Sequence, residues 1–474
     1  MDKEEKLEKF EELIEEIAKT NIEDNYDSFL ELEYLVLKSK NPVLNYKMLV
    51  NIDKGLLNTL GHEKAILNGD DAKVIYDYAR LLQDQGEDNK YTFMAIEKEI
   101  IRIGDPAYCF EYARHVKCAN IQALEKKVIE SKDAEYCYLF AGYIEGANKD
   151  ALEKVVIESK NVEYCYLFAR DIEGANKETL EKAVLESKDP QYCYEFADNI
   201  KDANKETLEK VVLESKDPKY CFMFARYIEG ANKDALEKVV IESKNVEYCY
   251  YFARDIKGAN IRLLEKVVIE SKDPDWCYHF ATKVEGANIK ALEKAIIESK
   301  DPDSYYSFAR DIEGANIKAL EKAIIESKDP DSCYLFARDI EGANVKALEK
   351  VVIESKDPDL CYSFAHDIEG ANIQALEKIV IESDDPELCY SFAKVEGANI
   401  EALEKEVIEC EIPSCCYSFA SNIKGANVYK FVNRLHEIDK YDKYTTELVE
   451  EIILPEYKIN SAKSLVKRLI ENKD

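Results

Sequence analysis

A tandem repeat of 28 residues is the sequence feature that most constrains the fold of this chain. The dipeptide Ala-Asn, usually preceded by Gly, recurs so that its second residue falls at Asn120, Asn148, Asn176, Asn204, Asn232, Asn260, Asn288, Asn316, Asn344, Asn372, Asn399 and Asn427. These positions advance by ten steps of 28 residues and one step of 27. Self-similarity of this kind is typical of arrays in which each copy is one supersecondary unit that buries its apolar face against its neighbours.

The first half of each copy predicts an amphipathic helix. In residues 316–343, Asn316 follows Gly-Ala and precedes an apolar-periodic run, as an N-cap does. One face of this helix carries residues three, four and seven positions apart: Leu320, Ala323, Ile324 and Ser327. The run ends at Lys328.

The second half of each copy predicts another helix. Asp329 and Pro330 supply an N-cap and a first helical residue, and Gly342 ends the unit with a residue that readily adopts positive φ. Its apolar stripe is formed by Cys333, Phe336, Ala337 and Ile340. Each helix then has roughly 11 or 12 residues and a length of about 17 Å. Helices this short are marginal alone in water, so the copies must stack.

These patterns predict an all-α fold, a right-handed α-solenoid or superhelix of about 14 stacked two-helix repeats with helical caps. We expect an acidic N-terminal capping helix in residues 1–28, degenerate helical repeats in 29–119, eleven regular repeats in 120–426 and a C-terminal helical cap in 427–474. The stripe of the first helix is formed by Leu7, Phe10, Ile14 and Ile17. The C-terminal cap is expected to contain helices at Tyr429–Ile438, Thr446–Ile453 and Ser461–Glu471.

The chain carries a formal net charge of −31, most of which belongs to the repeat. Residues 316–343 contain six acidic and four basic side chains, a net charge of −2 in that copy. This balance argues against direct nucleic-acid binding, because a phosphate-binding surface is basic. The acids predict either solubility of an elongated body or attraction of a basic partner. No signal peptide or membrane-spanning stretch is apparent, so we expect a cytoplasmic protein with no membrane partner.

Eleven of the fourteen cysteines occupy one position of the repeat, on the apolar stripe of the second helix. They are Cys109, Cys137, Cys165, Cys193, Cys221, Cys249, Cys277, Cys333, Cys361, Cys389 and Cys416. A whole hairpin separates neighbouring copies, which is too far for a disulfide, so we interpret these residues as small buried side chains in a reducing compartment. Cys410, Cys415 and Cys416 are spaced differently and leave open a thiol or metal site, although no Cys-x-x-Cys motif or histidine supports it.

The sequence contains no recognisable catalytic motif. No glycine-rich phosphate loop is present, and the five histidines occupy different repeat positions. The acids recur in every copy, which is typical of a solvated face, and we expect no catalytic residue, no cofactor and no resident metal. One interruption of the period is a one-residue deletion in Ala393–Gly397, which should shorten one helix end.

An aromatic residue follows the cysteine position in every copy, and an arginine often lies four residues further on, on the same side of the helix. The candidate partner-binding residues in this Tyr–Arg stripe are Tyr166, Arg170, Tyr250, Arg254, Tyr306, Arg310, Tyr334 and Arg338. Such a stripe can contact an extended peptide or stack on bases. The alternative is that each tyrosine packs between copies while each arginine pairs with a repeat acid.

The architecture resembles that of α-solenoids built from HEAT and TPR repeats, although these copies are shorter and lack the residues typical of those families. The run Asp-Pro-x-x-Cys-Tyr-x-Phe-Ala-Arg-Asp-Ile-x-Gly-Ala-Asn is similar to repeats in uncharacterised phage and bacterial proteins. This resemblance covers most of the chain and implies a helical repeat fold but no activity.

Three functions are compatible with the sequence. The first is a non-enzymatic scaffold that binds a protein or peptide, possibly a basic one, in the solenoid groove. The second is an acidic decoy that imitates nucleic acid and inhibits a basic nucleic-acid-binding protein. The third is a helical-repeat enzyme with a site in the C-terminal region or around the deletion.

Overall fold

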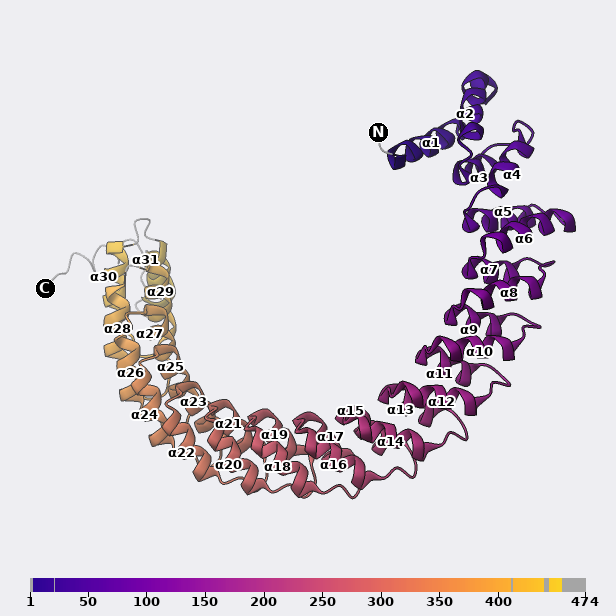
Figure 1. Ribbon diagram of the computed structural model, residues 1–474. Helices are drawn as coiled ribbons and strands as arrows, with labels where there is room; N and C mark the ends of the chain where they lie inside the picture. The colour runs from indigo at the N-terminus through magenta and orange to yellow at the C-terminus, as the bar shows by residue number, and fades with distance from the viewer. Residues whose placement is uncertain (1–2, 21, 411, 439–442, 454–474) are drawn as a thin grey trace. The chain divides into compact units, whose positions relative to one another are not determined.

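The computed structural model describes residues 3–20, 22–410, 412–438 and 443–453, and every regular element in these ranges is a helix (Figure 1). The predicted all-α fold is therefore confirmed. The chain divides into two compact units, residues 1–243 and 244–474, and each is described here by itself. The helix expected at Ser461–Glu471 lies outside the described residues.

The first unit contains α1 (Lys3–Ala18), the 3-10 helix η1 (Ile22–Asn25), α2 (Tyr26–Ser39), α3 (Pro42–Asn51), α4 (Thr59–Leu67), α5 (Ala72–Asp84), α6 (Lys90–Ile103), α7 (Pro106–His115), α8 (Ile121–Ser131), α9 (Ala134–Tyr143), α10 (Lys149–Ser159), α11 (Val162–Asp171), α12 (Lys177–Ser187), α13 (Pro190–Asn199), α14 (Lys205–Ser215), α15 (Pro218–Tyr227) and α16 (Lys233–Ser243).

The second unit contains α17 (Val246–Asp255), α18 (Ile261–Ser271), α19 (Pro274–Lys283), α20 (Ile289–Ser299), α21 (Pro302–Asp311), α22 (Ile317–Ser327), α23 (Pro330–Asp339), α24 (Val345–Ser355), α25 (Pro358–Asp367), α26 (Ile373–Ile381), α27 (Pro386–Phe392), α28 (Ile400–Glu409), α29 (Pro413–Asn422), α30 (Val428–Ile438), α31 (Lys443–Leu448) and the π-helix η2 (Val449–Ile453).

Within each unit the helices form two rows. Consecutive helices pack against one another, and most regular helices also contact the helix two places along, as α11 contacts α13 and α22 contacts α24. The even-numbered helices from α8 onward begin after the Ala-Asn dipeptide, and the odd-numbered helices begin in the middle of each copy. This pairwise stacking of hairpins is that of an α-solenoid.

The predicted caps form hydrogen bonds at both helix starts. The Asn316 side chain accepts a hydrogen bond from the backbone N–H of Ala319 at 3.3 Å, and the Asp329 side chain accepts one from Ser332 at 2.8 Å. Between the helices, Lys328 adopts the left-handed conformation, with φ of 60°. This conformation is unfavourable for a residue with a Cβ atom, and it recurs at the equivalent lysine of most copies.

The cysteine position lies in the core, as predicted. Leu320, Ile324, Cys333 and Phe336 are all fully buried. The thiol of Cys333 points to the carbonyl oxygen of Ile324, at 3.9 Å, and burial raises its pKa to about 12. All eleven cysteines at this position are buried free thiols, so they act as small core side chains.

The ends and the deletion modify the pattern locally. In α1, Ile14 is fully buried in a cluster with Phe29 and Val36, and the other predicted stripe residues pack against the same cluster. At the one-residue deletion, α27 has seven residues, whereas α25 and α29 have ten each. The predicted shortening of this helix is confirmed.

Candidate functional site

One glutamate of most even-numbered helices joins successive copies, in an arrangement named here the glutamate clasp. Glu265 is 5% exposed, and its Oε1 accepts a hydrogen bond of 2.6 Å from the backbone N–H of Asn288, which begins the next even-numbered helix. Burial raises the pKa of Glu265, and the hydrogen bond from Asn288 opposes this shift.

The same bond recurs along the array, with acceptors Glu97, Glu125, Glu153, Glu181, Glu209, Glu265, Glu293, Glu321, Glu349, Glu377 and Glu404. The interpretation of the repeat acids as a solvated face is therefore wrong for this position. A buried carboxylate that accepts a main-chain N–H at a helix start stabilises the junction between copies and is not available to a partner.

The predicted Tyr–Arg stripe lies on the odd-numbered helices, and each arginine is bound by its own copy. Arg310 donates to Asp311 through Nε and Nη2, at 2.8 and 2.7 Å, and its Nη1 donates to the Tyr306 hydroxyl at 3.1 Å. The guanidinium also lies over the Tyr306 ring, 5.0 Å from its centre. The pKa of Arg310 is raised, chiefly by the hydrogen bonds that it donates to Asp311 and Tyr306.

The other three pairs have the same local geometry. Their guanidinium carbons lie 5.2, 5.1 and 5.2 Å from the ring centres in the pairs Tyr166–Arg170, Tyr250–Arg254 and Tyr334–Arg338. The side chains of Arg170, Arg254 and Arg338 also form bonds of 2.7 Å to the aspartate that follows each of them.

Tyrosine hydroxyls link these clusters across copies. Tyr278 donates to Asp311 at 2.7 Å, although the two residues are 33 positions apart in the sequence. Tyr306 donates in the same way to Asp339, and Tyr334 donates to Asp367. In the second unit, residues 278–367 therefore hold one continuous chain of hydrogen bonds along the odd-numbered row.

This chain has an electrostatic consequence at Asp339. Hydrogen bonds from Arg338 and, to a smaller extent, Tyr306 lower the pKa of Asp339 to about 2. The tyrosines are largely enclosed, since Tyr166, Tyr250 and Tyr306 are between 4% and 8% exposed. In these four pairs the tyrosine packs between copies and the arginine pairs with a repeat aspartate, which is the packing alternative given for the stripe. Binding of a partner by the stripe remains a prediction.

A buried polar cluster that the sequence did not reveal lies in the first unit. The Nδ1 of fully buried His62 lies 2.7 Å from Asn45 Oδ1, and its Nε2 lies 3.3 Å from Glu33 Oε1. Burial lowers the pKa of His62, and Glu33 opposes this shift. Glu33 also accepts the backbone N–H of Asn58 at 2.6 Å, so the cluster is a variant of the glutamate clasp in a degenerate copy.

A polar hollow of about 500 Å³ lies beside the deletion, where the shortened α27 leaves space. His366, Asp367, Lys394 and Glu396 are among its lining residues. His366 Nδ1 lies 2.7 Å from Asp367 Oδ1, but the residues that line the hollow include no serine, threonine or cysteine. The lining therefore lacks the hydroxyl or thiol that accompanies a His–Asp pair in a catalytic triad.

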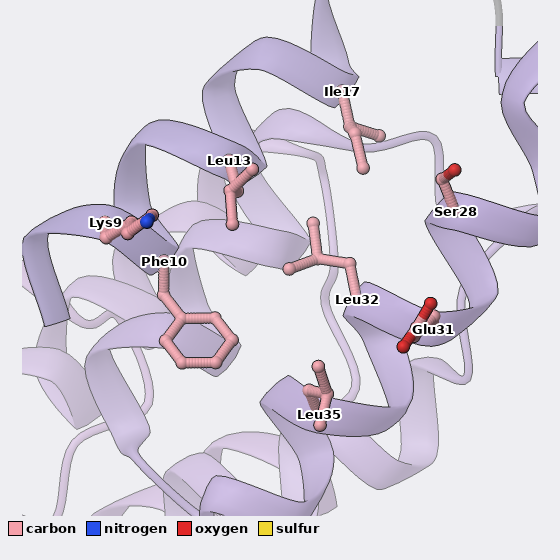
Figure 2. A pocket seen from close by; sticks show the side chains of 8 residues that line it. All are labelled: Lys9, Phe10, Leu13, Ile17, Ser28, Glu31, Leu32 and Leu35. Carbon is pink, nitrogen blue, oxygen red and sulfur yellow. The ribbon is translucent and has the colours of Figure 1, made fainter. Parts of the chain in front are cut away.

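An apolar groove of about 380 Å³ opens between α1 and α2 (Figure 2). Phe10, Leu13 and Ile17 of α1 face Leu32 and Leu35 of α2 across it. Leu13 and Leu35 are 38% and 39% exposed, so the floor of the groove is buried while its edges remain open. The predicted core stripe of α1 does not include Leu13, which belongs to a second apolar surface.

The surroundings of this groove are acidic. Lys9 and Glu31 are its charged lining residues. Helix α1 contains seven glutamates and three lysines, and α2 contains one aspartate, two glutamates and one lysine. The two helices that form the groove therefore carry a net charge of −6.

Comparison with known proteins adds no assignment, because no protein-family model matches the chain and no curated protein matches it. Among the described residues, no group of three or more His, Cys, Asp or Glu side chains is arranged to hold a metal ion. In the same part of the chain, no helix has the length and apolar character needed to span a membrane.

Proposed function

We propose that this protein is a non-enzymatic protein-binding scaffold whose docking site is the groove between α1 and α2. The observation that carries this proposal is the row of exposed apolar side chains, Leu13 and Leu35 among them, in an otherwise charged surface. Contiguous exposed apolar surface with a polar rim is typical of a protein interaction site. In the regular copies, by contrast, apolar side chains are used to stack one hairpin on the next.

The occupant that fits is an amphipathic helix with basic residues beside its apolar stripe. The groove runs along α1, whose 16 residues span about 24 Å. A helix of about four turns presents apolar side chains at intervals of three and four residues, which suits a groove of this kind. Lysine or arginine on its flanks complements the acidic charge of α1 and α2.

A second copy of this chain is a poorer occupant, because two copies of the same acidic helices would repel one another. The decoy alternative also has less support from the charge pattern. Lys322 lies 3.7 Å from Glu326 on α22, and equivalent lysine–glutamate pairs recur on most even-numbered helices. The acids on that row are thus interleaved with bases and form no uninterrupted anionic surface. The enzyme alternative rests on the hollow at the deletion, whose lining residues include no serine, threonine or cysteine beside the His366–Asp367 pair.

The test uses a fluorescent peptide of 16 residues with leucines at helical spacing and lysines on the flanks. We expect it to bind the full chain, with affinity falling as salt rises. A double variant, Leu13→Glu with Leu35→Glu, should weaken binding at least tenfold. The matched control is Leu60→Glu, an equivalent change at a side chain that is 78% exposed on α4.

Equal binding of a peptide with the same composition but a scrambled order would contradict recognition of an amphipathic helix. Undiminished binding to the double variant would place the site elsewhere. Sedimentation velocity tests whether a second copy of the chain occupies the groove. If the protein is a dimer and Leu35→Glu dissociates it, the occupant is a second copy and this assignment is overturned.

The Tyr–Arg stripe makes a separate prediction for a scaffold that binds along its odd-numbered row. Charge reversal of Arg254, Arg310 and Arg338 together should abolish binding of a protein partner without unfolding the chain. Unchanged affinity would dismiss the stripe as a binding surface and leave it with the packing role that its contacts describe.

A further inference from the structure

Two positions of most regular copies lie beside one another although they are six residues apart. In one copy, the Ser355 hydroxyl donates to the carbonyl oxygen of Val352 at 2.7 Å, and the Cys361 thiol points to the same oxygen at 3.9 Å. The serine at the end of the even-numbered helix and the cysteine of the following odd-numbered helix therefore meet at one carbonyl group. The same pair of contacts occurs in the next copy at Ser383 and Cys389.

One copy carries cysteine at both positions. Cys410 replaces the serine, and Cys416 occupies the usual cysteine position. Their Sγ atoms lie 3.9 Å apart, and the Cys416 thiol retains the expected contact with the Val407 carbonyl oxygen, at 3.3 Å. We propose that Cys410 and Cys416 form a reversible disulfide when the protein meets a peroxide.

The described residues of this turn make other contacts than those of the regular turns, since the Cys410 thiol points to the carbonyl oxygen of Ile412, at 3.8 Å. Elsewhere the serine hydroxyl accepts the N–H of the N-cap aspartate, as Ser355 does from Asp357 at 3.1 Å. Here Ile412 stands at the N-cap position and makes no side-chain capping bond. Cys410 has φ of −71° and ψ of 155°, so it is extended, whereas the equivalent Ser355 is the last residue of helix α24.

The movement that disulfide formation requires is small. A disulfide has an S–S length of about 2 Å, so the two sulfur atoms must approach by about 2 Å. Arg434 of α30 holds the end of α28 from the opposite side, where its Nε donates to the Ile408 carbonyl at 2.8 Å. Its Nη2 also donates to the carbonyl oxygens of Glu409 and Cys410, at 3.4 and 3.5 Å, so the backbone up to Cys410 is held and the sulfur atoms approach by rotation of their side chains.

Access determines the order of the reaction. Cys410 is partly exposed, whereas Cys416 is fully buried and burial raises its pKa to about 12. A peroxide therefore reacts first at the Cys410 thiolate, whose sulfur forms a bond to one peroxide oxygen as the O–O bond breaks and water or an alcohol leaves. The Cys416 sulfur, as thiolate, then attacks the Cys410 sulfenic acid. The S–S bond forms and the S–O bond breaks, and the proton that Cys416 released on becoming a thiolate passes through solvent to the leaving hydroxide, which departs as water.

Cys415 is the competing thiol, and its contact directs it elsewhere. Its Sγ lies 3.2 Å from the carbonyl oxygen of Pro386, in the preceding copy. The eleven regular cysteines are not competitors among themselves, because successive copies separate them by a hairpin. The remaining cysteine, Cys118, lies at the start of the array.

The experiment compares the full-length protein with Cys410→Ser and Cys415→Ser after mild hydrogen peroxide treatment. Cys410→Ser restores the residue found in the other copies and should fold normally. Trypsin releases both thiols in one peptide, residues 406–424, so a disulfide appears as a loss of two hydrogen masses that thiol reductant reverses. We expect this product in the original chain and in Cys415→Ser, and its absence in Cys410→Ser.

Formation of the product in Cys410→Ser, or its loss in Cys415→Ser, would overturn the assignment of the pair. Accumulation of irreversible Cys410 sulfinic acid without a cross-link would overturn the proposal as a whole. Circular dichroism of each reduced variant confirms that the comparison is made between folded chains.

Discussion

Removal of one glutamate clasp should loosen the junction between two particular copies. We choose Glu265→Ala in α18, because its partner, the N–H of Asn288, begins α20 in the same unit. The control is Glu270→Ala in the same helix. Glu270 is 58% exposed and lies 3.6 Å from Lys266. Both changes remove one carboxylate and leave the same helix former, so helix propensity cancels between them.

The magnitude follows from the contacts that each side chain makes. A hydrogen bond to a charged group contributes about 1.5–3 kcal/mol, and an unpaired buried donor adds to the loss. The variant also removes a carboxylate whose burial is unfavourable, as its raised pKa indicates, and this gain offsets part of the cost. We therefore expect a loss of about 2 kcal/mol for Glu265→Ala. An exposed lysine–glutamate pair contributes roughly 0.3–0.5 kcal/mol to stability, so the control Glu270→Ala should lose no more than this.

Native-state hydrogen exchange is the suitable assay, because long repeat arrays do not always unfold in one step. A loss of about 2 kcal/mol corresponds to an increase of roughly 30-fold in the opening equilibrium. We expect faster exchange at Asn288 and the first turn of α20, where the N–H of Asn288 has lost its acceptor. Equal exchange in Glu265→Ala and Glu270→Ala, at every amide of α20, would refute the assignment of the clasp as a junction.

Three further predictions concern titration and backbone strain. Tyr306→Phe should raise the pKa of Asp339 from about 2, which carboxyl NMR titration measures. Because folding lowers the pKa of Asp339, its ionised carboxylate stabilises the fold at any pH above the ordinary pKa of aspartate, and this stabilisation is lost as pH falls through about 2. An unchanged titration of Asp339 in Tyr306→Phe would contradict the hydrogen bond between the two residues. The lowered pKa of His62 means that the unfolded chain binds the proton first, so stability of the first unit should fall as pH drops below about 6.5. Urea unfolding of His62→Gln should lack this component, and an identical pH profile would refute it. Lys328→Gly should stabilise the second unit by about 1 kcal/mol, since φ is 60° there, whereas Lys318→Gly inside α22 should destabilise it.

The sequence predicts most of the fold because the 28-residue period repeats every local signal many times. Asn316 and Asp329 cap their helices as predicted, and Gly342 adopts positive φ at the end of its copy. The left-handed Lys328 was not predicted, because lysine has no local preference for that conformation. There the tight connection between the two packed helices overrides the preference of the residue.

Contacts between copies were harder to predict, because they depend on where a side chain lies around the helix axis. Glu265 and Lys266 recur equally faithfully at neighbouring positions, yet Glu265 is 5% exposed and the Lys266 side chain is 69% exposed. Recurrence alone does not distinguish a buried acceptor from a solvated base. The bond between Tyr278 and Asp311 is likewise hidden in the sequence, although the regular occurrence of an aspartate after the arginine was a usable signal.

The same contacts explain why function is sought where the period is broken. In the regular copies the clasp glutamates bind main-chain N–H groups, the stripe arginines bind their own aspartates, and the core cysteines face carbonyl oxygens. A partner that binds there must replace bonds already formed, at the cost of leaving buried groups unpaired. The groove between α1 and α2 leaves Leu13 and Leu35 exposed, and Cys410 stands where the other copies have serine. The exposed leucines and the second thiol are additions to the repeat pattern, so binding or oxidation there uses groups that the regular copies do not offer.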